Sequence, residues 1–165
     1  MAREPNGRAQ RAGRVSDKQD AMSVVIAYRQ KVLGVSPKDV MDQKAATLLG
    51  RLCLQGAISN AQWQAGEDWH KLVDAMSAMA NAPRGFKTAT SGGNGQISDD
   101  DAARRYRDIK GRFDRANDAI EDHAPATECV ARFKALRTII VDQIDQPQMH
   151  GTLRTALNGL VKHFG

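Results

Sequence analysis

The stretch LCLQGAISNAQWQAGEDWHKL, residues 52–72, contains the stop and start signals of two helices joined by a tight turn. Its first, apolar segment stops at Gly56, a residue type that readily adopts the left-handed conformation that closes a helix. Ser59 and Gln62 then bound the sequence SNAQ, a capping box in which each side chain satisfies a backbone amide of the other residue. The stretch therefore predicts a helical corner, followed by a long helix over about residues 60–81.

Helical signals continue on the N-terminal side of this corner. Apolar residues at helical spacing predict a helix over about residues 17–33 that ends at Gly34. Ser36 and Pro37 have the residue types of a cap and a first helical position, so a second helical region is expected from there, broken near Asp42. Its second half is strongly apolar: Ala45, Leu48, Leu49, Leu52 and Cys53.

Three helices are expected on the C-terminal side. The first carries a heptad-like seam with steps of four and three residues: Ala102, Tyr106, Ile109, Phe113, Ala116 and Ile120. The second, over about 127–145, is predicted to turn inward Val130, Phe133, Leu136, Ile140 and Ile144. The third, over about 149–163, is predicted to turn inward Leu153, Ala156, Leu157 and Leu160.

Composition fits a helical core. Apolar residues make up 41% of the chain but aromatic residues only 5%, and no run alternates with the period of a strand. We expect an all-α domain of five or six helices, orthogonal or bundle-like, with helix-turn-helix-like corners. The expected organisation is a flexible, disordered basic arm (1–15), an N-terminal helical half (16–82), a Gly/Ser/Thr-rich loop (83–97) and a C-terminal helical half packed in the same domain (98–165).

The net charge of +5 is concentrated near the N-terminus. Residues 1–38 contain eight Lys/Arg and three Asp/Glu, whereas residues 39–98 contain five of each and residues 99–165 contain eleven of each. A basic arm on a neutral body suits a polyanion, because lysines and arginines release counterions from phosphates. A solvated tail without a partner is an equal alternative.

Catalytic and metal-binding patterns are missing from the sequence. Its four histidines have no metal-ligand spacing, and GGNG at 92–95 lacks the Lys-Ser/Thr of a phosphate-binding loop. Cys53 and Cys129 form no CxxC pair and are expected to be reduced core residues. We predict a non-enzyme without metal or cofactor, with no membrane segment, in the cytoplasm of a bacterial host cell.

Two units are candidates for contact with nucleic acid. At the corner, Asn60, Gln62 and Gln64 have side chains that bond base edges, but Glu67 and Asp68 follow them and would repel phosphates. The C-terminal helices and the arm carry basic residues on polar faces. The predicted nucleic-acid-binding residues are Arg3, Arg8, Arg11, Arg14, Lys134, Arg137, Arg154 and Lys162.

Basic residues are also frequent in the predicted helix that carries the heptad-like seam. Six basic residues lie between 104 and 115, away from the seam, with Asp108 and Asp114 among them. Two interpretations of this run remain open. Its basic residues contact phosphates, or they form ion pairs with the aspartates of the same helix on a solvated face.

Two segments resemble a known family. GRLCLQGAISNAQWQAGEDWHKL (50–72) and TLRTALNGLVKHFG (152–165) are similar to an uncharacterised helical domain of alphaproteobacterial and phage-derived proteins, including regulators of gene transfer agents. There it accompanies helix-turn-helix or sigma-factor-like segments, whereas this chain shows no obvious separate DNA-binding domain before it. The matching positions are Gly56, Ser59, Gln62, Ala65, Gly66, Glu67, Leu153, Ala156, Leu157, Leu160, His163 and Phe164.

Together, the resemblance and the basic arm lead to a functional expectation. It is a non-enzymatic, phage- or prophage-type regulatory protein that binds nucleic acid, DNA rather than RNA, or RNA polymerase, and so controls transcription. The alternative is a small terminase-like DNA-packaging subunit that self-associates through the heptad-like seam and contacts phage packaging proteins.

Overall fold

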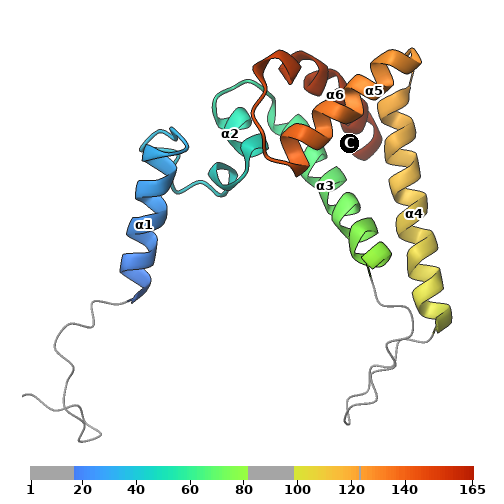
Figure 1. Cartoon of the computed structure of the whole chain (residues 1–165), viewed down its shortest axis with the longest axis horizontal. Coiled ribbons are helices and arrows are strands. Elements are labelled where there is room, and N and C mark those ends of the chain that lie inside the picture. The colour runs from blue at the N-terminus through green and yellow to red at the C-terminus, as the bar shows by residue number, and fades with distance from the viewer. Residues whose placement is uncertain (1–16, 82–98, 123) are drawn as a thin grey trace, which may run out of the picture. The chain divides into compact units, whose positions relative to one another are not determined.

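The fold is entirely helical in the residues that the structure, a computed structural model, describes: 17–81, 99–122 and 124–165. Six α-helices lie in these ranges, and within them no strand is present, which confirms the all-α prediction (Figure 1). Contacts divide the chain into two compact units, residues 1–46 and residues 47–165. The predicted arm (1–15) and the predicted loop (83–97) lie outside the described residues.

The first unit contains helix α1, Asp17–Lys31, and a following turn region. Gly34 has a φ of 64°, and the Val35 amide donates to the carbonyl of Arg29 (3.0 Å), which is the left-handed helix ending predicted at that glycine. Arg29 then binds the turn region, since its Nη1 donates to the carbonyl of Val40 at 2.7 Å.

Residues 37–42 are not helical, so the prediction of a helix starting at Pro37 was wrong. The Ser36 hydroxyl bonds the Asp39 carboxylate (2.7 Å), and so it does not cap a helix. Amides then bond carbonyls three residues back, Asp39 to Ser36 and Asp42 to Asp39, in successive turns. Regular structure resumes with a 3-10 helix, η1, Gln43–Ala46, directly after the break expected at Asp42.

The second unit begins with the predicted corner. Helix α2, Leu48–Leu54, ends at Gly56, whose φ is 75°. Helix α3, Asn60–Asn81, then starts with the predicted capping box. The Ser59 amide donates to Oε1 of Gln62 (2.8 Å), and the Gln62 amide donates to Oγ of Ser59 (3.2 Å).

Replacing Ser59 by alanine is expected to lower the free energy of unfolding by about 1 kcal/mol, because the Gln62 amide loses its acceptor. Chemical denaturation measures this change. Ser77 is an exposed serine inside the same helix, so Ser77→Ala is the control and should stay within about 0.5 kcal/mol of the parent. Equal losses in the two variants would mean that the cap contributes nothing.

Helix α6, His150–Phe164, is the centre of the second unit. It packs against α3, against α4 (Asp99–Glu121) and against α5 (Ala126–Leu136), as Figure 1 shows. Its four predicted inward residues are all at most 1% exposed, which confirms that prediction: Leu153, Ala156, Leu157 and Leu160. Glycines permit the closest approaches, because a Cβ on Gly159 would collide with the backbone oxygen of Ala119 in α4.

The predicted inner face of α5 was partly wrong. Leu136 and Ile140 are buried, but Val130 is 69% exposed and Ile144 is 51% exposed. The helix changes at Arg137–Val141 into a π-helical segment, η2, and the chain leaves helical geometry after it. Because a wider turn shifts the side-chain register, Ile139 and Ile140 both enter the core while Ile144 lies beyond it. A short 3-10 helix, η3, Pro147–Met149, precedes α6.

Two of the six seam residues of α4 are fully buried within this unit, and two more, Ile109 and Phe113, are half-buried. Ala116 and Ile120 are fully buried, whereas Tyr106 is 43% exposed and Ala102 is also exposed. Helix α4 has 23 residues and α6 has 15, a difference of roughly 12 Å at 1.5 Å per residue. None of the described helices combines the length and apolar character needed to cross a membrane.

Candidate nucleic-acid interface

A run of six exposed basic residues lies on α4, with Asp108 and Asp114 among them. We call it the α4 basic face, and all of its members are exposed: Arg104, Arg105, Arg107, Lys110, Arg112 and Arg115. Arg104 and Arg115 are separated by eleven residues, or roughly 16 Å along the helix axis. The α4 basic face therefore extends over about three helical turns.

Few of these cations are neutralised. Lys110 forms an ion pair with Asp114, with 2.6 Å between Nζ and Oδ2. Within the described residues, no other ion pair involves a member of the α4 basic face. The hydrogen bond with Asp114, followed by the charge of that carboxylate, raises the pKa of Lys110 above its usual value. Among the described residues, the five arginines have no carboxylate within ion-pair distance, so the self-pairing alternative holds for Lys110 alone.

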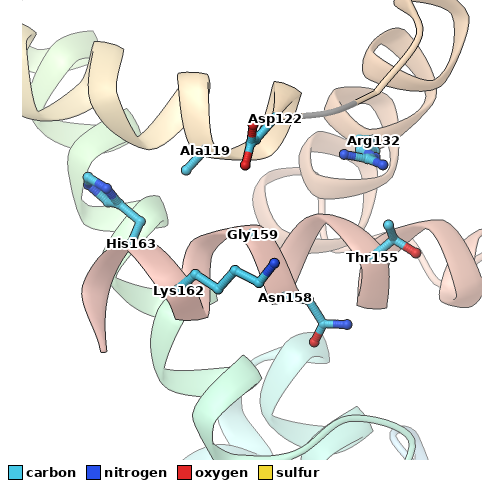
Figure 2. Close-up of a pocket in the computed structure, with 8 residues that line it drawn as sticks. All are labelled: Ala119, Asp122, Arg132, Thr155, Asn158, Gly159, Lys162 and His163. Carbon is cyan, nitrogen blue, oxygen red and sulfur yellow. The ribbon is translucent and has the colours of Figure 1, made fainter.

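A cavity of about 320 Å³ lies where α4, α5 and α6 meet. Figure 2 shows Ala119 of α4 and Asp122, directly after α4, on one side of it, and Arg132 bordering it from α5. The remaining lining residues come from α6: Thr155, Asn158, Gly159, Lys162 and His163. A neighbouring cavity of about 470 Å³ shares Arg132 and Thr155, so the two form one polar groove beside α6.

Two polar side chains that line the groove form hydrogen bonds with other parts of the chain. Nη1 of Arg132 donates to the carbonyl of Ile120 at the end of α4 (2.8 Å), and its Nη2 lies 3.4 Å from Glu128. Oδ1 of Asn158 accepts a hydrogen bond from Nε2 of Gln62 at 2.8 Å. Lys162 also lines the groove from α6 and has no ion pair among the described residues, and Asp122 lines it from the end of α4.

The groove and the α4 basic face are neighbours on one helix. Arg115, Ala119 and Asp122 follow one another at intervals of four and three residues, which places them on the same side of α4. The basic face consequently leads along α4 to the groove.

The predicted binding residues fall into three groups. Arg3, Arg8, Arg11 and Arg14 lie outside the described residues. Arg154 and Lys162 are exposed on α6 and, with Asn158 between them, form a stripe spaced by four residues. Lys134 and Arg137 are exposed at α5 and η2 but line neither cavity.

At the helical corner, the polar residues are occupied by contacts within the chain. Gln62 serves both the cap and Asn158. The side-chain amide of Gln64 donates to Asp68 at 3.4 Å, and that carboxylate also binds Lys71 at 2.8 Å. The start of α3 is thus fixed against α6, with its acidic residues close by.

The α4 basic face was missing from the predicted binding residues, although its sequence carried a usable signal. Arg104, Arg112 and Arg115 recur at helical spacing opposite the seam, with Asp108 among them, so contact with phosphates was one of the two interpretations left open. What the pattern left open was which cations the two aspartates neutralise. Side-chain positions decide this, and they pair Asp114 with Lys110.

A group of histidine, cysteine, aspartate and glutamate side chains fit to hold a metal ion does not occur in the described part of the chain. Cys53 and Cys129 are both free and half-buried. Comparison with known proteins adds no relative: no family model, no curated protein and no solved structure matches this chain.

Proposed function

We propose that this protein is a non-enzymatic, phage- or prophage-type regulator that binds DNA through phosphate contacts of α4 and α6. The observation that carries the proposal is the α4 basic face, whose five arginines have no carboxylate partner among the described residues. Guanidinium groups bind phosphates in bidentate geometry, and each contact releases counterions. Lys162 in the groove and Arg154 beside it on α6 add positive charge.

The binding is independent of base sequence in this proposal. Arginines on a helix face contact phosphates and position the protein, whereas base readout requires side chains free to enter a groove of the duplex. At the corner, Gln62 and Gln64 are held by contacts inside the chain. A regulator of this kind takes its target sequence from a partner, and the family resemblance suggests RNA polymerase as that partner.

The proposal is tested by titrating a random-sequence DNA duplex, followed by fluorescence anisotropy over a range of salt concentrations. The double variant Arg112→Gln/Arg115→Gln should lower the slope of log affinity against log salt by about 2, since each lost phosphate contact removes about 0.9. At low salt the affinity should fall more than about tenfold.

Lys71→Gln is the matched control. Lys71 is an exposed cation of the same unit, but it is paired with Asp68, and its loss should leave the slope unchanged. Failure of the parent protein to bind duplex DNA at low salt, together with recovery of no RNA polymerase in a pulldown from host cells, would overturn the proposal.

One observation favours the packaging alternative. The exposed end of the seam, Ala102 and Tyr106, is the kind of apolar surface through which subunits self-associate. Arg105, Lys110 and Arg112 flank this surface, however, and two copies paired through it would bring like charges together. The mass of the full chain in solution separates the alternatives: a ring-sized oligomer favours packaging, and a monomer or dimer favours regulation.

A further inference from the structure

Exposed apolar side chains are concentrated in the first unit. Of the nine large apolar residues that are exposed in the described ranges, six lie within residues 22–41. Four exposed positions of α1, which we name the α1 stripe, recur with steps of four, three and four: Ala21, Val25, Tyr28 and Val32. This spacing places them along one side of a helix. The Val32 amide donates to the carbonyl of Tyr28 (2.9 Å), so helical geometry extends to the last member.

The first unit has little core of its own to stabilise α1. Within residues 21–46, the buried side chains are Val40 and Ala45, and both come after the helix. Ile26 and Leu33 are half-buried on another side of α1. An isolated helix of 15 residues is marginally stable in water, and an open apolar stripe on it indicates a surface that a partner covers.

Charge narrows the choice of partner. Residues 21–31 contain two charged side chains, Arg29 and Lys31, and neither belongs to the α1 stripe. Nη1 of Arg29 donates to the carbonyls of Val40 (2.7 Å) and Asp42 (3.4 Å) in its own unit. A charged partner surface would gain no ion pair from the stripe and would lose the water around its own charges. The stripe therefore fits an uncharged helix face of similar length.

The α1 stripe is itself such a face, and it is complementary to itself in antiparallel pairing. Steps of four, three and four read the same in both directions. Two-fold pairing consequently places Tyr28 of one copy opposite Val25 of the other, and Val32 opposite Ala21, so a larger side chain meets a smaller one at each contact. The two Lys31 side chains are then separated by roughly 13 Å along the helix axis, beyond the Debye length of about 8 Å.

We propose that the α1 stripe is a self-association surface through which two copies of this chain pair as an antiparallel two-helix dimer. Both copies use the same residues, as in a symmetric interface with a two-fold axis. The stripe is only roughly 16 Å long, so the contact is smaller than a standard interface of about 1,600 Å², and we expect a dissociation constant in the micromolar range. This inference is independent of the proposed function, because it involves no nucleic acid.

Sedimentation equilibrium of the full chain, from about 1 to about 500 µM, tests the pairing. The average mass should rise with concentration from the monomer toward twice the monomer. Val25→Glu brings like charges together near the two-fold axis, so it should raise the dissociation constant more than about tenfold. Val130→Glu is the matched control at a valine that is 69% exposed on α5, and it should stay within about twofold of the parent. Circular dichroism verifies that both variants fold.

Mixing variants identifies a second copy as the partner. Val25→Lys alone should weaken pairing as Val25→Glu does, whereas an equimolar mixture of the two should form a mixed dimer, because opposite charges then meet. Orientation is tested by mild oxidation of Ala21→Cys mixed with Val32→Cys, which should crosslink. Val32→Cys alone should not, since its two copies lie roughly 16 Å apart along the axis. The parent, with free Cys53 and Cys129, gives the background.

Each contrary result counts against the dimer. A parent that stays monomeric over the whole range overturns it, and lower thermal stability of monomeric Val25→Glu would then indicate that another part of the chain covers the stripe. Equal weakening by Val25→Glu and Val130→Glu, or no mixed dimer from Val25→Glu and Val25→Lys, also contradicts it. Duplex binding by a monomeric parent would leave the proposed function standing, whereas a dimer that binds no DNA would support this inference and count against that function.

Discussion

Replacing Gly159 by leucine is expected to lower the free energy of unfolding by about 4 kcal/mol, at or above the upper end of the usual effect of overpacking. A Cβ at this position would collide with the carbonyl oxygen of Ala119, and the carbonyl carbon lies only 3.2 Å from it. A backbone cannot rotate away as a side chain can, so α4 and α6 must separate. Urea denaturation followed by circular dichroism measures the loss.

Gly151 provides the matched control in the same helix. A Cβ built there meets nothing within 4 Å, and the residue is exposed. Gly151→Leu should therefore stabilise the protein by about 0.5 kcal/mol, because leucine has the higher helix propensity. If Gly159→Leu and Gly151→Leu shifted the midpoint of urea denaturation in the same direction, close contact between α4 and α6 would not explain why residue 159 is a glycine.

Replacing Leu157 by alanine is expected to destabilise the protein by about 3 kcal/mol, within the range measured for buried leucines. Leu157 is fully buried in the core, and its Cδ2 lies 3.1 Å from the position that a Cβ on Gly66 would take. The same methyl group thus packs against the backbone of α3 at Gly66, and its removal leaves a cavity between α3 and α6. The midpoint of urea denaturation should fall while the slope of the transition stays constant.

Val130→Ala is the control for Leu157→Ala. Val130 is 69% exposed on α5, and its truncation should change the free energy of unfolding by no more than about 0.5 kcal/mol. A loss comparable to that of Leu157→Ala would show that Val130 is buried in solution, as its spacing in the sequence predicts.

The contacts along α6 divide the polar side chains by role. Asn158 and Arg132 connect helices, the first to Gln62 at the start of α3 and the second to the end of α4 at Ile120. The guanidinium groups of the α4 basic face make no such connection to another helix among the described residues. Substitutions on that face are therefore expected to change binding and leave folding intact, so the DNA titrations test contact with phosphates directly.

The sequence predicted the helical corner closely, because its signals act over a few residues. Gly56 adopts a positive φ, and Ser59 and Gln62 bond each other's amides as the SNAQ pattern predicts. Helix α3 accordingly spans Asn60–Asn81, as expected. At Ser36 the same kind of reasoning failed, since the hydroxyl found a nearer partner in the Asp39 carboxylate.

The candidate interface was less predictable. Periodicity placed the arginines of α4 opposite the seam, but it could not tell which of them an aspartate neutralises. It also could not tell that Arg132 is held at Ile120 by a bond spanning twelve residues. Both facts depend on how helices approach one another, which a spacing rule within one helix does not contain.

By itself the sequence determined the helical class, the cap at Ser59, the glycine endings at Gly34 and Gly56, and the inner face of α6, because backbone hydrogen bonds and amphipathic spacing are local properties. Only the tertiary structure decided that the seam is buried at Ala116 and Ile120 but open at Tyr106, and that Val130 faces outward. The physical reason is that burial requires a neighbouring helix packed against the residue, and the spacing of apolar residues within one helix does not contain the position of its neighbours.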